Sequence, residues 1–163
     1  MDIKIYPDPV LLKTCVSVEK VDDNFISTVS IMVDTMRAAE GIGLAAPQVG
    51  ILQRFFVCLD FDDENKEKTI VLINPEITKM EGRIESKEGC LSIPGFYEYV
   101  YSYEKIEIKA YDLTGKEVIY VPDGIQSVVF QHEFDHLDGI LFPERMSQIK
   151  KDIFMKKINK EFK

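Results

Sequence analysis

Two histidines, His132 and His136, are the only ones among 163 residues, and Glu133 directly follows the first. On an α-helix, residues four apart lie on the same face, so both imidazoles can bind one ion. Glu133 would then stand beside that ion, where a carboxylate can exchange protons with a metal-bound water. This spacing predicts part of a hydrolytic metal site. The alternative is a surface helix that carries two solvated histidines.

A catalytic metal site usually has three protein ligands, so a third ligand must be found. In the pattern HExxHxxGxxH it would stand at position 142, which is Phe142 here. Glu144 is too close along the chain to return to the site, and Glu161 lies in a lysine-rich tail. Both are weak candidates. Cys90 is the remaining option, because Gly89 precedes it and a Pro-Gly turn follows, which suits a thiolate held on a shaped loop.

The rest of the chain must position these groups, and its apolar periodicity predicts an α+β fold. Helices are expected over 24–40, from after Gly124 to Asp138, and over 147–160. The expected extended segments are 54–60, 70–74, 76–85, 105–112 and 117–121. The last two are joined by a hairpin turn. One helix before the strands and two after them predict antiparallel or mixed sheets wrapped around a central helix.

The central helix of this prediction is apolar nearly all round, which indicates that it is buried. Its apolar residues are Val128, Val129, Phe130, Phe134 and Leu137. Two histidines, a glutamate and an aspartate in such a helix need partners, because burying unpaired polar groups is costly. A metal ion supplies a partner. The burial therefore favours the metal site over the solvated surface helix.

Length and composition suit one domain spanning residues 1–163. No apolar run is long enough to span a membrane, and the first residues resemble neither a signal peptide nor a transit sequence. The cysteine count is odd, which argues against a disulfide framework and favours a reducing cytoplasm. Cys15 and Cys58 are interpreted as small buried hydrophobic residues.

The charge is unevenly distributed. A net charge of −8 argues against a general nucleic-acid binder. Residues 144–163 hold seven lysines and arginines against three acids, so this segment is +4 and the rest of the chain is −12. The basic segment is either the solvated face of a helix or a tail that docks on an anionic partner.

Three phrases stand in order along the chain: GLAAPQ at 43–48, EGCLS at 88–92 and HEFDH at 132–136. Together they resemble the motifs of the peptide deformylases, GφGφAAxQ, EGCφS and HEφDH, at all defining positions. Their order and separations fit the chain from the first helix to the last. The resemblance implies hydrolysis of the N-formyl group of formylmethionine at the start of new polypeptides, with release of formate.

The resemblance also implies a role for each site residue. The metal ligands would be Cys90, His132 and His136. The ion would typically be Fe²⁺, with Zn²⁺, Ni²⁺ or Co²⁺ also accepted. Glu133 would act as general base and then as general acid. The side-chain amide of Gln48 and the backbone N–H of Leu91 would stabilise the oxyanion.

The methionine side chain of the substrate needs an apolar pocket. By position, the candidates for its wall are Ile42, Leu91, Val128 and Val129, and the alternative for each is an ordinary core residue. The other expected substrate-binding residues are Gly43, Leu44 and Gly89. The glycines would let the peptide backbone approach closely as an added strand. In bacterial members the C-terminal helix helps to dock the enzyme on the ribosome, so residues 144–163 are expected to do so here. No membrane partner or sequence-specific nucleic acid is expected.

One segment departs from the family pattern. Residues 96–103 are unusually aromatic, and Ser102 stands where many members carry an arginine. We therefore expect a different substrate rim, or a different charge partner for Asp135.

Two other functions are compatible with parts of this pattern. An HExxH metallopeptidase would need a histidine or glutamate as third ligand, where the sequence offers Cys90. A non-catalytic formyl-peptide or metal-binding module would lack the general base, yet Glu133 is present.

Overall fold

The structure is a computed structural model that describes residues 1–61 and 67–162. Its helices are α1 (Asp23–Ala38), α2 (Gly124–Leu137) and α3 (Gln148–Glu161). Its strands are β1 (Gly43–Ala45), β2 (Phe55–Phe61), β3 (Glu67–Glu81), β4 (Ile84–Cys90), β5 (Ile93–Ser102), β6 (Lys105–Tyr111) and β7 (Glu117–Tyr120). No helix in the described ranges is long and apolar enough to cross a membrane.

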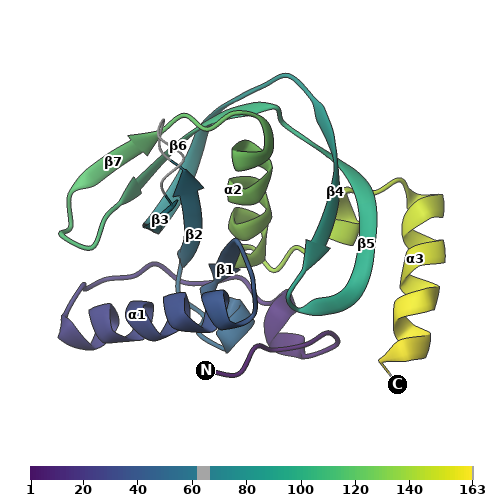
Figure 1. The fold of residues 1–163 in the computed structure, drawn as a ribbon, viewed down its shortest axis with the longest axis horizontal. Coiled ribbons are helices and arrows are strands. Elements are labelled where there is room, and N and C mark those ends of the chain that lie inside the picture. Colours follow the sequence, from purple (N-terminus) through teal and green to yellow (C-terminus); the bar gives the residue numbers. More distant parts are fainter. Residues whose placement is uncertain (62–66, 163) are drawn as a thin grey trace.

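Two antiparallel sheets surround α2 (Figure 1). One has the strand order β1-β2-β3-β6-β7, and the other is the β4–β5 hairpin. Phe130 and Leu137 of α2 pack against Phe56 and Ile108 of the larger sheet. The expected α+β fold with a central helix between sheets is therefore confirmed.

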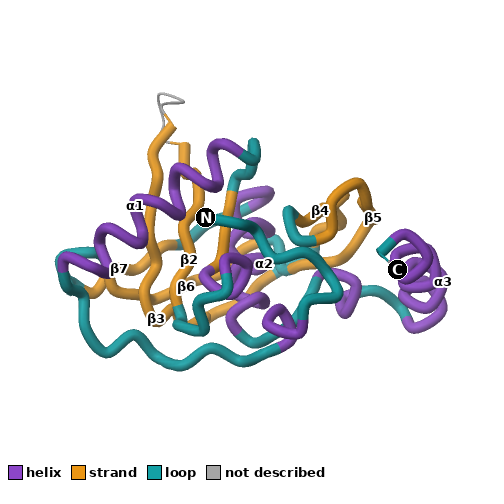
Figure 2. Tube along the Cα trace, turned by 90° about the horizontal axis from the view of Figure 1, so that it is seen from below, coloured by secondary structure: helices purple, strands orange, loops and turns teal. Residues whose placement is uncertain are grey.

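Helix α1 covers the opposite face of the larger sheet (Figure 2). Alternate residues of β2 point to opposite faces. Phe55 and Val57 accordingly pack toward α1, while Phe56 and Cys58 pack toward α2. Asp22 caps α1 by accepting a hydrogen bond from the backbone N–H of Phe25 at 3.0 Å. Because β2 is covered on both faces, it is apolar at nearly every position.

The C-terminal helix α3 lies outside the β4–β5 hairpin (Figure 2). Phe154 and Ile158 of α3 are buried with Ile93 of β5 and with Phe142, in the short 3₁₀ helix Phe142–Arg145. The sequence predicts this helix within one residue at each end, and Ser147 is its N-cap. Lys163, the last residue of the predicted basic segment, lies outside the described residues.

The predicted strands differ from the structure in the middle of the chain. The expected segments 70–74 and 76–85 form one strand, β3, which ends at Glu81. Asn74, in the left-handed region at φ 50°, begins a register shift that accommodates Pro75 without ending the strand. The expected loop around Cys90 is the end of β4 and the tight connection to β5.

Candidate active site

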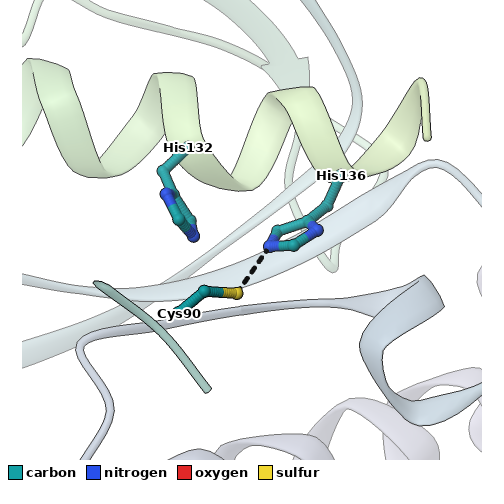
Figure 3. Close-up of side chains that lie close together, drawn as sticks. All are labelled: Cys90, His132 and His136. Atoms are coloured by element: carbon teal, nitrogen blue, oxygen red, sulfur yellow. Dashed lines mark hydrogen bonds between the residues drawn. The ribbon is translucent and has the colours of Figure 1, made fainter. Parts of the chain in front are cut away.

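Three possible metal ligands from distant parts of the sequence meet in the structure (Figure 3). The ligand atoms of Cys90, His132 and His136 all lie within 4.8 Å of one another. Cys90 Sγ is 3.3 Å from His136 Nε2. Around a tetrahedral ion, sulfur and nitrogen ligands are separated by roughly 3.5 Å, so the group is nearly pre-formed. The structure thus brings together all three ligands proposed from the sequence.

Two elements hold this group. His132 and His136 project from one face of α2, one helical turn apart, toward the sulfur of Cys90 (Figure 3). Cys90 is the last residue of β4, where the hairpin register shifts between Gly89 and Cys90. The connection between β4 and β5 is tied to the N-terminal segment, because the backbone carbonyl of Ser92 accepts a hydrogen bond from Tyr6 N–H at 2.8 Å.

The polar groups around the ligands fit a bound cation. In the described part of the chain, Glu133 Oε2 and His136 Nδ1 are buried side-chain atoms without a hydrogen-bond partner. Burial, and after it the neighbouring His132, hold the pKa of His136 well below its ordinary value. The neutral imidazole is the form that binds metals. A free thiol, a neutral imidazole and an unpartnered carboxylate oxygen together match a divalent metal with a water molecule.

Glu133 is 4% exposed and lies against β1. A side chain at Gly43 would overlap the Glu133 carboxylate, so a larger residue here would displace the carboxylate from its present position. Burial raises the pKa of Glu133 to about 7, although nearby His132 opposes the shift. A carboxyl group with a pKa near neutrality can both accept and return a proton.

Gln48 is buried and oriented by hydrogen bonds at both ends of its amide. Its Oε1 accepts from Ala45 N–H at 2.8 Å. Its Nε2 donates to Ser92 Oγ at 3.1 Å and to Cys90 Sγ at 3.4 Å. The N–H groups of Gln48 therefore face the metal ligands. Ser92 was missed as a site residue, although it stands in the EGCLS phrase.

A further layer of polar residues supports the ligands, and most of these residues had no role predicted from the sequence. Glu88 Oε2 lies 2.9 Å from His132 Nδ1, which leaves the other ring nitrogen for the metal. Ser102 Oγ donates to Glu88 Oε1 at 3.3 Å. Asp135, whose charge partner was expected to differ, is bound by Arg145. Glu88 stands in a motif and could have been found, but nothing in the sequence marks Arg145.

A cavity of about 450 Å³ opens beside the ligands. Most of the expected substrate-binding residues line it: Ile42, Gly43, Gly89, Leu91, Val128 and Val129. The exception is Leu44, which is 0% exposed and packs in the core with α1. Strand alternation turns the Leu44 side chain away from the face that Gly43 presents, so this side chain does not line the cavity. Ile125 and Tyr97 also line the cavity and were missed.

A Cys-His-His group beside a buried glutamate, an oriented amide and an apolar cleft defines a metal-dependent hydrolase site. The sequence profile of the family described as polypeptide deformylase matches residues 1–152. A curated peptide deformylase from Thermodesulfovibrio yellowstonii is 44% identical, over 96% of this chain and 95% of its own. The chain belongs to the polypeptide deformylase family.

Solved structures agree with this assignment. The crystal structure of peptide deformylase from Thermus thermophilus has a TM-score of 0.90 and 41% identity, covering 98% of this chain and 93% of its own. That from Ehrlichia chaffeensis in complex with actinonin has a TM-score of 0.89 and 34% identity, covering 99% and 96%. The chain is thus a metal-dependent enzyme that removes the N-formyl group of nascent polypeptides, as the sequence predicts.

Proposed function

We propose that Cys90, His132 and His136 hold one divalent cation and that the cavity beside them is the deformylation site. The observation that carries this proposal is the buried, unpartnered oxygen of Glu133 next to the three ligands. When bound, the cation polarises the formyl carbonyl and lowers the pKa of a water molecule. The chain's own residues then move the proton and stabilise the negative charge.

Glu133 is the proton carrier in this mechanism. Its unpartnered Oε2 accepts the proton of the attacking water, and the same carboxyl group returns it to the amine that leaves. Its burial supports this role, because a pKa raised to about 7 makes the return of the proton favourable near neutral pH. Loss of a general base typically costs about 10²–10⁴-fold in rate.

Gln48 and Leu91 stabilise the oxyanion as the formyl carbon becomes tetrahedral. One N–H of the Gln48 amide donates to Cys90 Sγ over a long 3.4 Å contact. Because this hydrogen bond is weak, the same N–H can donate to the substrate oxyanion instead. The contact to Ser92 keeps the amide in place. The backbone N–H of Leu91 follows the metal ligand directly in the chain and supplies the second donor.

The cleft supports recognition of formylmethionine. Leu91, Val128, Val129 and Ile125 provide an apolar wall for the methionine side chain. Gly43 and Gly89 allow a peptide backbone to lie close to β1 and β4 as an added strand. Actinonin, which the Ehrlichia chaffeensis relative binds, is expected to occupy the same cleft.

The resident ion is proposed to be Fe²⁺, with Zn²⁺, Ni²⁺ and Co²⁺ as substitutes. A thiolate with two imidazoles accepts all four ions, so the donor set supports this list. The choice of Fe²⁺ rests on the family resemblance. Metal analysis of protein purified without oxygen identifies the ion.

We further propose that residues 1–163 work as one cytoplasmic domain that docks on the ribosome through α3. Three free cysteines support a reducing compartment. Lys156, Lys157 and Lys160 are exposed on α3, which lies on the outer side of the hairpin (Figure 2). Their charge suits an anionic surface such as ribosomal RNA.

Formate release from a formyl-Met-Ala peptide tests the proposed function. The parent protein should release formate, and Glu133→Ala should lower kcat by about 10²–10⁴-fold while metal content stays unchanged. Cleavage of an internal peptide bond, or full metal content in Cys90→Ala, would instead favour the metallopeptidase. Equal formate release by Glu133→Ala would refute the proton role, and none by the parent would favour a binding module.

A further inference from the structure

Three buried carboxylates crowd the side of α2 that carries the histidines. Glu88 is 7% exposed, Glu133 is 4% exposed and Asp135 is 9% exposed. A buried carboxylate without a compensating cation is strongly destabilising.

Arg145 supplies that cation. Its Nε donates to Asp135 Oδ2 at 2.5 Å, and its Nη2 donates to Asp135 Oδ1 at 2.9 Å. This is the planar, two-pronged geometry that only arginine provides. Although burial opposes it, the nearby Asp135 and Glu88 raise the pKa of Arg145, which stays charged. Within residues 1–61 and 67–162, no other lysine or arginine has an ion pair with Glu88, Glu133 or Asp135.

Arg145 and Ser102 reach the same place from different elements. Both line a cavity of about 360 Å³ behind the hairpin, with Ser102 on β5 and Arg145 in the 3₁₀ helix that follows α2. Ser102 also donates a hydrogen bond to Glu88, which lies outside this lining. Arg83 also lines this cavity, but its guanidinium stacks 3.6 Å from the centre of the Tyr101 ring. Arg83 therefore does not replace Arg145.

We propose that Arg145 is a positioning residue of the metal centre. Its guanidinium fixes Asp135 on α2 and balances the charge of Glu88, which in turn orients His132 through the 2.9 Å contact to Nδ1. The supporting guanidinium thus comes from the 3₁₀ helix after α2, and position 102 on β5 holds only the small hydroxyl of Ser102. The inference rests on the proposed metal site. It adds that metal affinity depends on a residue that touches neither the metal ligands nor the substrate.

The experiment measures the Co²⁺ dissociation constant by competition with a chelator, together with the absorption of Co²⁺ bound to the Cys90 thiolate. Arg145→Ala should raise the dissociation constant by about 10–100-fold, the usual cost of losing a group that orients a ligand. The dissociation constant of Arg145→Lys should lie between those of the parent and Arg145→Ala, because an ammonium keeps the charge without the paired hydrogen bonds. If circular dichroism shows that Arg145→Ala folds poorly, Arg145→Lys replaces it as the test variant.

The decisive variant combines Arg145→Ala with Ser102→Arg. A guanidinium delivered from β5 into the emptied cavity should recover most of the lost Co²⁺ affinity and the parent absorption. The matched control is Arg54→Ala, which removes the ion pair with Asp138 at the same end of α2. It should leave the dissociation constant unchanged.

Three results would overturn the proposal: parent-like Co²⁺ affinity in Arg145→Ala, equal losses in the Arg145 and Arg54 variants, or no recovery in the double variant. Two other results would instead refute the proposed metal site. If the parent binds no Co²⁺, or if Cys90→Ser binds it equally well, the proposed ligand set fails and the role of Arg145 fails with it.

Discussion

Glu133 and His136, which are buried near each other, require opposite charge states: a charged carboxylate and a neutral imidazole. His136 must be neutral to bind a metal, and burial lowers its pKa. Glu133 must be charged to accept a proton, yet burial raises its pKa to about 7. A cation next to both favours the charged glutamate and the neutral histidine together. The metal-free site is therefore the less favourable electrostatic state.

The pH dependence of catalysis follows from Glu133. Its deprotonated form is the base, so kcat/KM should rise with pH through an acidic limb. Burial, partly opposed by His132, raises the pKa of Glu133 to about 7, and a bound cation would lower it toward the ordinary 4.5, so the limb should fall between these values. Initial rates of formate release, with folding verified by circular dichroism, measure the limb. A flat profile across this range would rule out Glu133 as the titrating base.

The residues of the site were predictable to different extents. Motif spacing was sufficient to predict that Cys90, His132 and His136 lie together with Glu133 beside them, because metal chemistry restricts residue type and helical separation. The side chain of Leu44 lies outside the cavity, because a motif does not show which face of a strand a side chain takes. Arg145 could not be predicted, because its pairing depends on how the chain turns after α2.

At the scale of elements, α3 packs behind the active site through aromatic contacts, although it contributes no ligand. Phe154 of α3 is buried against Phe142, with ring centres 5.5 Å apart. Phe142 in turn stacks on His132, with ring centres 6.1 Å apart. Removing everything after Ser147 would therefore expose this cluster and disturb the site. We therefore expect truncation to affect both the proposed ribosome docking and catalysis.

This packing predicts a contrast between two apolar residues of α3. Phe154→Ala should lower the free energy of unfolding by about 3–5 kcal/mol, the usual cost of emptying a buried phenylalanine site. Ile149→Ala should change it by less than about 0.5 kcal/mol, because Ile149 is 77% exposed. Urea unfolding measures both. Similar values for the two variants would mean that α3 does not belong to the cooperative core.

The elements themselves were only partly predictable. All three helices were found because a helical apolar stripe is long and repetitive. β4 and β5 were missed, because their outward residues include the exposed Tyr97, Tyr99 and Tyr101 and because Pro94 and Gly95 interrupt the pattern. The long strand β3 was divided at Pro75, where only its pairing with β6 shows that the strand continues.

At the scale of the molecule, the cleft and the exposed lysines of α3 lie on separate elements. The cleft is lined by residues of β1, β4, β5 and α2, whereas Lys156, Lys157 and Lys160 face solvent on α3. Charge on these lysines can therefore change without altering the metal ligands. This separation allows docking to be tested without truncation.

Reversing the charge of α3 should weaken ribosome association. The triple variant Lys156→Glu, Lys157→Glu and Lys160→Glu should co-sediment less with ribosomes at low salt, with unchanged formate release from a short formyl peptide. The control reverses three exposed lysines elsewhere: Lys13, Lys105 and Lys116. If both variants co-sediment like the parent, α3 is not the contact. If both lose association equally, only net charge matters.

The stacking of Phe142 on His132 also has a consequence for the order of assembly. During synthesis, Cys90, His132 and His136 are all present before the residues of α3 exist. The nascent chain thus contains every proposed metal ligand before α3 is synthesised. At that stage α3 cannot yet pack against Phe142, which stacks on His132. Stable capture of the metal is expected to be a late event, completed as the final turns of α3 fold against the hairpin.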